Sequence, residues 1–307
     1  MRDHRSPAIN ALAVSAQEEH LATRRAAGLF DFSFMGLYEF SGQPSLQKLQ
    51  TRDLDALAPG QIAYTLLLNE DRSVLIDATV WRLDGGRFWL FTGKRLAFQA
   101  RDRSGEYAIL ALQGPASGRI LALLIGREAL LGLRYFRFLE KGGLIVGRLG
   151  YSGELGYELL VPAALSGGLR QRVLDAGREQ GLRECSFEAA NSLRIECGYV
   201  LFDREIDGRA NPRELGLDRL VEDKSTAFHM SRKLVGMQIL DEPAGPRAAT
   251  VSSECWSPTL EKQIALGFTA ADVGPGERVR LDDGRAARVE RLPFYDPERR
   301  LPRSAPL

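Results

Sequence analysis

The sequence predicts an α+β fold. Runs with the composition of strands alternate with segments of helical pattern, and they do not follow the regular rhythm of βαβ units. Beyond residue 247 the chain is strand-like and is broken by glycine and proline turns, as at Gly274-Pro275-Gly276. We therefore expect an α+β region in residues 1–242, a linker at Pro243–Arg247 and a small β-barrel or sandwich within residues 243–307.

The N-terminal third predicts two helices and several strands. Residues 1–14 look like a loose leader. Ser15 begins a helix that runs to Ala27, because Glu18, three residues later, completes a capping box. A second helix is expected at Pro44–Leu57, where Pro59-Gly60 ends it. The strands are expected at Phe34–Phe40, Gln61–Leu68, Val74–Trp81 and Arg87–Thr92, the last two in an antiparallel sheet.

The stretch Asn69–Leu83 holds the most informative polar residue. After a polar turn it becomes a run of β-branched, aliphatic and aromatic residues with one carboxylate, Asp77, in its middle. A strand this apolar is expected to be buried on at least one face, and burying an unpaired charge is costly. Asp77 is therefore either a structural residue bonded to backbone amides at a strand kink or a functional carboxylate.

The middle of the chain continues the alternation of strands and helices. Strands are expected at Glu106–Leu112, Tyr135–Leu139, Leu144–Leu149 and Leu159–Val161, and helices at Ala116–Leu131, Leu165–Gln180 and Glu188–Glu196. Before the last of these strands lies a glycine-rich loop, Gly150–Glu158. Its glycines permit a positive φ or the close approach of another group.

The composition excludes several classes of function. The 307 residues carry a formal net charge of +1, which provides no strong field toward nucleic acid or an anionic membrane. No apolar run approaches the roughly 20 residues of a membrane span, and the first 20 residues lack the apolar core of a signal peptide. No P-loop, G-x-G-x-x-G or G-x-S-x-G motif supports nucleotide binding or serine hydrolysis.

Cysteine and histidine are scarce. Cys185, Cys197 and Cys255 are odd in number and far apart, which fits a reducing, cytoplasmic location and predicts no metal site. The chain has only three histidines. Acid–base chemistry, if the chain is an enzyme, is therefore expected to fall to carboxylates.

An ordered set of short motifs runs through the chain. They are H-L-A-T-R-R-A-A-G-L-F-D-F-S-F-M-G from His20, P-G-Q-I-A-Y-T-L-L-L-N-E from Pro59, I-D-A-T-V-W-R-L from Ile76, A-L-Q-G-P from Ala111, G-Y-S-G-E-L-G-Y-E from Gly150, S-L-R-I-E-C-G from Ser192, P-R-E-L-G-L-D-R-L-V from Pro212, W-S-P-T-L from Trp256 and P-F-Y-D-P from Pro293. Together they resemble the glycine-cleavage T-protein (aminomethyltransferase) family over roughly residues 18–300. The D-A-T-V-W-R-L variant is closest to the folate domains of dimethylglycine- and sarcosine-oxidising enzymes.

The resemblance implies a three-lobed α+β fold around a central folate channel, with two interleaved lobes in residues 1–242 and a β-barrel as the third lobe. It also implies transfer of an aminomethyl or methyl unit to tetrahydrofolate. The catalytic Asp of the family falls on Asp77, its pterin-binding Glu falls on Glu158, and Tyr64 falls beside the site.

Other residues have two readings. Tyr151 and Tyr157 either face the ligand or pack in the core, and Trp81 either lines the channel or packs. Arg194 and Glu196 are expected to form an internal ion pair that supports the fold.

The conserved carboxylates of the family suit this chemistry. A carboxylate near N5 and N10 of tetrahydrofolate can stabilise positive charge, orient the folate and move protons, and such groups contribute roughly 10²–10⁴-fold in rate. The amino-pyrimidinone edge of the pterin presents adjacent N–H donors. A second carboxylate, such as Glu158, can accept two of them in parallel.

The chain departs from the family just before its sixth motif and beside Asp77. Where the family usually has an Arg–Asp unit, this chain has Ala190 and Asn191. The first residue of the usual Asp-Asp pair is Ile76 here. The loss of a positive charge at Ala190 predicts weaker folate binding or a changed folate pose.

Three functions stay open at this point. The first is a tetrahydrofolate-dependent transferase or demethylase that takes its one-carbon unit from a small molecule or a carrier protein. The second is a non-catalytic folate-binding protein, but the K-G-C-Y-x-G-Q-E segment of such relatives is absent after L-D-R-L-V. The third is a regulatory or scaffold chain that acts with a partner subunit.

Overall fold

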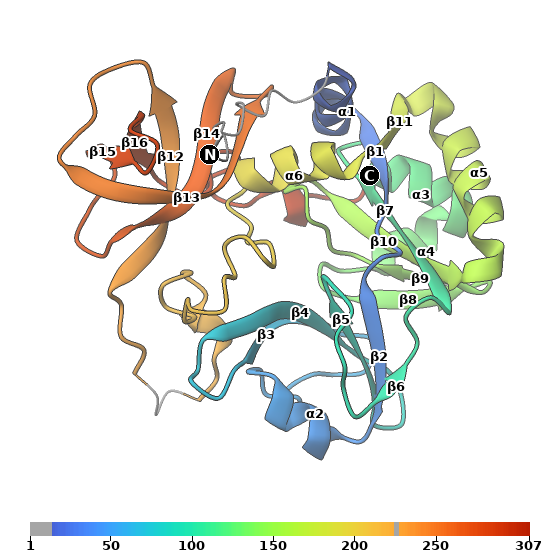
Figure 1. Cartoon of the computed structure of the whole chain (residues 1–307). Coiled ribbons are helices and arrows are strands. Elements are labelled where there is room, and N and C mark those ends of the chain that lie inside the picture. The colour runs from blue at the N-terminus through green and yellow to red at the C-terminus, as the bar shows by residue number, and fades with distance from the viewer. Residues whose placement is uncertain (1–13, 224–226) are drawn as a thin grey trace, which may run out of the picture.

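The chain forms two sheets and a ring of C-terminal strands, with helices set around them (Figure 1). This computed structural model describes residues 14–223 and 227–307, so the expected leader lies outside the described residues except for residue 14. Helices and strands occur in the irregular alternation that the sequence predicts. The α+β class is therefore confirmed.

The first sheet has six strands and is covered by helices on one face. Its order is β11 (Leu182–Cys185), β1 (Ala27–Asp31), β7 (Tyr107–Gln113), β10 (Gly156–Pro162), β9 (Leu144–Gly147) and β8 (Phe138–Lys141). The covering helices are α3 (Ser117–Ile125), α4 (Arg127–Gly132) and α5 (Ser166–Gly177). Ile120 and Val173 of these helices pack against Leu110 and Leu159 of the sheet, and burial of this apolar surface stabilises the first unit.

The second sheet has five strands, all antiparallel. Its order is β3 (Ile62–Leu68), β4 (Val74–Arg82), β5 (Arg87–Thr92), β2 (Gly36–Ser41) and β6 (Arg101–Asp102). One face is covered by α2 (Gln43–Leu49), whose Leu46 packs against Ile76 and Val80 of β4. The predicted antiparallel pairing of β4 and β5 is confirmed.

The two sheets share a core on their inner faces. Trp81 of β4 and Phe91 of β5 pack in one cluster with Phe30 of β1 and Leu160 of β10. Leu193 of α6 (Phe187–Glu196) belongs to the same cluster, so this helix closes the space between the sheets. Residues that point from either sheet into this region are thereby brought near one another.

The C-terminal strands pair in a ring. Its members are β12 (Arg232–Leu240), β14 (Lys262–Ala270), β13 (Arg247–Ser257), β15 (Arg278–Leu281) and β16 (Ala286–Glu290). β12 pairs with both β14 and β16, which closes the ring. The ring therefore starts before residue 243, and the expected linker is the loop between two of its strands. A division of the chain into domains at that residue stays a prediction.

Two predicted helices differ from the structure. The helix expected at Pro44–Leu57 ends at Leu49, because the side chain of Gln47 bonds to the backbone beyond it: its Oε1 accepts from the Leu54 N–H at 2.9 Å. Such side-chain bonds to the backbone compete with a helix. The helix expected at Ala116–Leu131 is two helices, because Gly126 has a φ of 86°.

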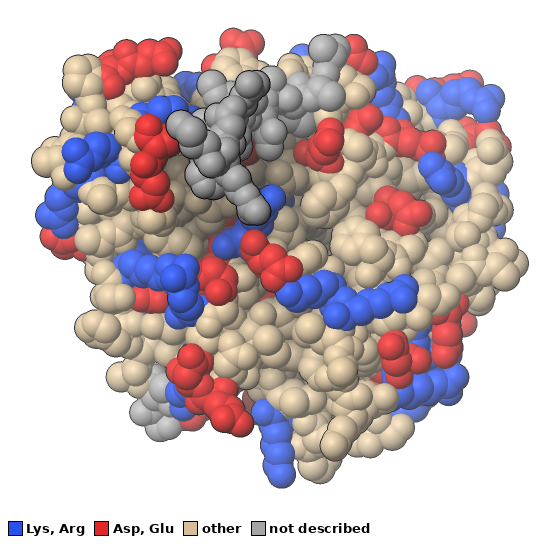
Figure 2. All heavy atoms as spheres, viewed as in Figure 1, with Lys and Arg blue, Asp and Glu red and all other residues tan. Residues whose placement is uncertain are grey.

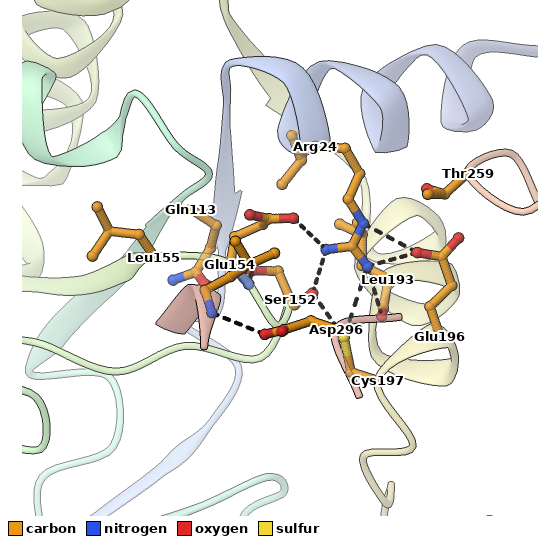
Figure 3. A network of polar contacts seen from close by, with 12 residues as sticks. Arg24, Gln113, Ser152, Glu154, Leu155, Leu193, Glu196, Cys197, Thr259 and Asp296 are labelled. Atoms are coloured by element: carbon orange, nitrogen blue, oxygen red, sulfur yellow. Dashed lines mark hydrogen bonds and ion pairs between the residues drawn. The ribbon is translucent and has the colours of Figure 1, made fainter. Parts of the chain in front are cut away.

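A buried ion-pair network joins helix α1 (Val14–Arg25) to α6 and to the glycine-rich loop (Figure 3). The Arg24 guanidinium lies 2.6 Å from a Glu196 oxygen and 2.8 Å from a Glu154 oxygen, and it donates to the Ser152 carbonyl at 2.8 Å. Its other face lies over the ring of Tyr295, 3.9 Å from the centroid. The side chains of Arg24 and Glu196 are 5% and 0% exposed, so each charge depends on the other.

The carboxylate of Glu196 is also bonded from its other side. The His20 imidazole lies 3.1 Å from it, and the hydroxyl of Ser257 donates to it. Although burial acts to raise its pKa, the hydrogen bond from His20 and the charge of Arg24 lower the pKa of Glu196 to about 2.

We expect Arg24→Met to lower the free energy of unfolding by about 3–5 kcal/mol, because it leaves two buried carboxylates without their cation. Urea unfolding followed by circular dichroism measures this. The control is Arg170→Met, which breaks the exposed Arg170–Glu184 pair and should cost about 1 kcal/mol or less. Equal effects of the two substitutions would show that the network does not stabilise the fold.

Candidate functional site

Asp77 projects from β4 toward the space between the two sheets. Its neighbours Ile76 and Ala78 point into the core under α2, so strand alternation turns Asp77 and Trp81 to the other face. Tyr64 of β3 lies on that face and donates its hydroxyl to Asp77 Oδ2 at 2.9 Å.

The carboxyl of Asp77 has a pKa near neutrality. Burial raises the pKa of Asp77 to about 6, and the Tyr64 hydrogen bond acts in the opposite direction. Burial raises the pKa of Tyr64 as well, so its hydroxyl keeps its proton and acts as a donor. The side chain of Asp77 is therefore oriented by another side chain of the predicted site.

Glu158 projects from β10 on the face that looks toward the second sheet. It pairs with Ala111 of β7 and Gly147 of β9, and Ala111 and Leu160 belong to the cluster between the sheets. Glu158 is 7% exposed, and no hydrogen bond or ion pair to its carboxylate occurs among residues 14–223 and 227–307. Burial alone raises its pKa to about 7. A carboxyl with so little exposure and no protein partner depends on water or a ligand for its hydrogen-bond donors.

Tyr151, in the glycine-rich loop, is a third residue of the predicted site. Its ring stacks on Tyr199 at 5.9 Å between centroids, and its hydroxyl donates to the carbonyl of Val200. It lies close enough to Asp77 that burial and the Asp77 charge both act to raise its pKa. It also lines a small pocket, whose other residues are Phe30, Phe32, Gln113, Ser152 and Ala190.

Two residues expected at the ligand lie elsewhere. Tyr157 neighbours Glu158 on β10, so its side chain points to the opposite face and packs under the helices of the first sheet. Trp81 is 0% exposed and packs between Phe91 and Phe138, with centroid distances of 4.9 and 5.1 Å. We therefore correct both assignments, because neither side chain has a surface left for a ligand.

The structure also corrects the pairing expected within α6. Arg194 does not pair with Glu196; it lies 2.6 Å from Glu205, and its Nε donates to Asn191 Oδ1 at 2.9 Å. Both charges of this buried pair act on the pKa of Asp77, Glu205 raising it and Arg194 lowering it. Sequence reasoning missed Glu205, because it lies 11 residues beyond Arg194 in an irregular segment without a motif.

Ala190, the position of the expected family arginine, is enclosed. It is 4% exposed and packs in the cluster that contains Phe30, and it lines the small pocket with Tyr151. An arginine side chain at this position would displace these neighbours.

Several site types are absent from the described part of the chain. No group of three or more His, Cys, Asp or Glu side chains in it is arranged to hold a metal ion. The three cysteines are free, and no helix within the described ranges is long and apolar enough to cross a membrane. On the face shown in Figure 2, basic and acidic side chains are interspersed rather than gathered by sign.

Comparison with known proteins decides the family. The family model described as "GCVT N-terminal domain" matches residues 8–225. The chain is 35% identical to an aminomethyltransferase of Symbiobacterium thermophilum, over 93% of this chain and 91% of that protein. The chain belongs to the aminomethyltransferase family. An aminomethyltransferase of Halothermothrix orenii is 31% identical over 90% of each chain.

The fold agrees with this assignment. The crystal structure of the glycine cleavage system aminomethyltransferase T from Bartonella henselae matches with a TM-score of 0.77 and 26% identity, over 92% of this chain and 90% of that one. Aminomethyltransferases use tetrahydrofolate, and membership gives this chain the function of a folate-dependent one-carbon transferase. None of these relatives is named as a non-catalytic folate-binding protein.

In this aminomethyltransferase-family chain we expect Glu158→Gln to remove a pH-dependent loss of stability. The folded pKa of about 7 lies above the ordinary 4.5, so between these values the folded protein binds more protons than the unfolded chain. The contribution of Glu158 to the free energy of unfolding therefore falls by up to about 3 kcal/mol as the pH rises from about 4.5 to about 7.

Urea unfolding of both proteins at pH 5 and pH 8 measures the effect. The variant should gain stability over the wild type as the pH rises, whereas Glu184→Gln, at an exposed residue of β11, should show no such gain. A difference in unfolding free energy between Glu158→Gln and wild type that is the same at pH 5 and pH 8 would contradict the raised pKa of Glu158.

Proposed function

We propose that this protein transfers a one-carbon unit from an amine donor to tetrahydrofolate, with Glu158 binding the pterin and Asp77 at the reacting atoms. The observation that carries the proposal is the buried carboxyl of Glu158, which has no partner among the described residues and faces the same inter-sheet region as Asp77. The pterin edge offers two adjacent N–H donors, which a carboxylate accepts in parallel. Such a ligand therefore removes the penalty of the unpaired group.

The proposed folate channel lies between three lobes, which are the two sheets and the C-terminal ring. Helix α6 borders the same channel. Tyr64 and Asp77 project into it from the second sheet, and Tyr151 and Glu158 from the first sheet and its glycine-rich loop. Ile195 of α6 packs against Cys255 and Leu266 of the ring, which supports treating the ring as a third lobe. We place the start of that lobe near Arg232, because β12 pairs within the ring.

Asp77 is suited to acid–base and electrostatic work in this channel. Tetrahydrofolate, when bound, supplies a nucleophilic N5 that accepts the one-carbon unit. With a pKa of about 6, Asp77 is charged at neutral pH and can still take up a proton. In a desolvated site its charge stabilises positive charge that develops beside it. The hydroxyl of Tyr64 fixes the orientation of the carboxylate.

The donor is proposed to be an amine, presented by a small molecule or by a carrier protein. The D-A-T-V-W-R-L segment from Asp77 favours secondary amines, since its closest resemblance is to the folate domains of enzymes that oxidise them. A cytoplasmic location and a partner subunit stay predictions from the sequence.

We expect Asp77→Asn and Glu158→Ala to separate turnover from binding. Asp77→Asn is nearly isosteric and should lower turnover by on the order of 10²-fold or more with little change in folate affinity. Glu158→Ala should weaken tetrahydrofolate binding by about 2–4 kcal/mol and slow turnover at saturation less. Calorimetric titration and initial rates measure the two effects, with exposed Glu184→Ala as the control. Wild-type affinity in Glu158→Ala, or wild-type turnover in Asp77→Asn, would remove that residue from the site.

We expect Tyr64→Phe to shift the acid limb of the pH–rate profile to higher pH. The Tyr64 hydroxyl favours the charged form of Asp77, so its removal raises the pKa of that carboxyl. A shift of about one unit corresponds to about 1.4 kcal/mol, within the range of one hydrogen bond to a charged group. Rates at saturating substrate from pH 5 to pH 8 provide the measurement. A shift to lower pH would show that Tyr64 does not stabilise the carboxylate.

A further inference from the structure

Gln113, the last residue of β7, has an enclosed side chain between two glycines of the neighbouring strands. It pairs with Gly28 of β1 on one side and with Gly156 of β10 on the other. Its register places it on the same face as Ala111 and Glu158, which is the face of the candidate site. The residue is 1% exposed, and its side chain lines the small pocket beside Tyr151.

The amide of Gln113 is bonded to the glycine-rich loop and to the residue that precedes it. Its Oε1 accepts a hydrogen bond from Ser152 Oγ at 2.8 Å, and its Nε2 donates to the Leu149 carbonyl at 3.4 Å. The same Ser152 hydroxyl accepts from the Glu154 N–H at 3.2 Å. One buried amide thus bonds directly to Leu149 and Ser152, which lie on either side of Gly150 and Tyr151.

The same amide explains two glycines of the motif. A Cβ on Gly150 would lie 1.9 Å from Gln113 Oε1, and a Cβ on Gly156 would lie 2.3 Å from the same oxygen. The three nearest atoms in each case belong to the Gln113 side chain, and neither glycine has a left-handed φ. These two positions are therefore glycine because Gln113 fills the space, not because of the backbone conformation.

Gly153 of the same loop is glycine for a different reason. It has a φ of 80°, and a Cβ there would meet Cys197 Sγ at 2.1 Å rather than Gln113. It therefore provides a matched control within one loop.

We propose that Gln113 is the positioning residue of the glycine-rich loop that borders the proposed pterin site. Its amide fills the space inside the loop and sets the backbone path of Gly150–Gly156. Tyr151 follows Gly150, and Glu158 lies two residues beyond Gly156. The path of the loop therefore makes both side chains face the ligand. Gln113 acts through the loop and touches no reacting atom. This inference rests on the proposed function, because it takes the glycine-rich loop as one wall of the pterin site.

The test is a thermodynamic cycle between Gln113→Ala and Gly156→Ala. Each single substitution should raise the tetrahydrofolate dissociation constant at least tenfold while turnover at saturation falls less than threefold. The double variant should bind more tightly than Gly156→Ala alone, because the new methyl group occupies space that the amide has left. Additive losses in the double variant, or wild-type affinity in Gln113→Ala, would overturn the proposal.

The control cycle pairs Gln113→Ala with Gly153→Ala. Because Gly153 meets Cys197, removing the amide should give no rescue, and the two losses should add. Rescue of this pair to the same degree would show a general loosening of the loop and would also overturn the proposal. Gln113→Met, which keeps most of the volume and removes both hydrogen bonds, replaces Gln113→Ala if that variant does not fold.

Hydrogen exchange of the loop amides separates failure of this inference from failure of the proposed function. If wild-type protein does not bind tetrahydrofolate in the titration, the proposed function fails. The inference is then judged by exchange at residues 150–156, which should be fast in Gly156→Ala and slower again in the double variant with Gln113→Ala. Unchanged exchange in all variants overturns the role of Gln113.

Discussion

The buried guanidinium of Arg24 is the interaction on which the arrangement of the site depends. It bonds to Glu196 at the end of α6 and to Glu154 and Ser152 in the glycine-rich loop, so one cation fixes two elements that border the proposed channel. A cation of this kind cannot leave the network without exposing two buried charges to an apolar interior. The loop and the helix are therefore held at fixed positions by the protein's own side chains.

Four acidic residues, of which Asp77 is half-buried and the others are buried, fall into two groups according to their partners. Glu196 is bonded by a cation, an imidazole and a hydroxyl, and its pKa lies at about 2; Glu205 is paired with Arg194. Glu158 has no partner within the described ranges and has a pKa of about 7, and Asp77, bonded to the Tyr64 hydroxyl, has a pKa of about 6. Bonded carboxylates hold the fold, whereas those with free acceptor capacity are available to a ligand or a proton.

Much of the fold could be predicted from the sequence, because it rests on local patterns. Runs of aliphatic and aromatic residues give β5 at Arg87–Thr92 and β3 within one residue of its limits. The helix after Pro44 was predicted too long, because the bond that ends it comes from the side chain of Gln47. The spacing of apolar residues in the sequence does not indicate such a side-chain hydrogen bond.

The site could be predicted only in part. Motif similarity gives Asp77, Tyr64 and Glu158, but strand geometry was needed to see that Tyr157 points away from its neighbour Glu158. Sequence patterns could not identify the partners of the buried charges, because Arg24 and Glu196 are 172 residues apart. Such pairs are decided by how α1 and α6 pack together.

The change at Ala190 shows what the pocket can still recognise. Apolar packing against the Phe30 cluster occupies the place of the family arginine, and Asn191 now accepts from Arg194 instead of presenting a charge. The pocket beside Tyr151 therefore has aromatic walls and an uncharged amide, and the nearby Glu158 is an acceptor with no cation bound to it. An anionic group gains little in such surroundings, whereas a heterocycle with N–H donors can bond to the carboxylate of Glu158. On the proposed assignment, recognition at this end of the channel depends on the pterin ring itself, and the negative charge of the folate tail is accommodated elsewhere.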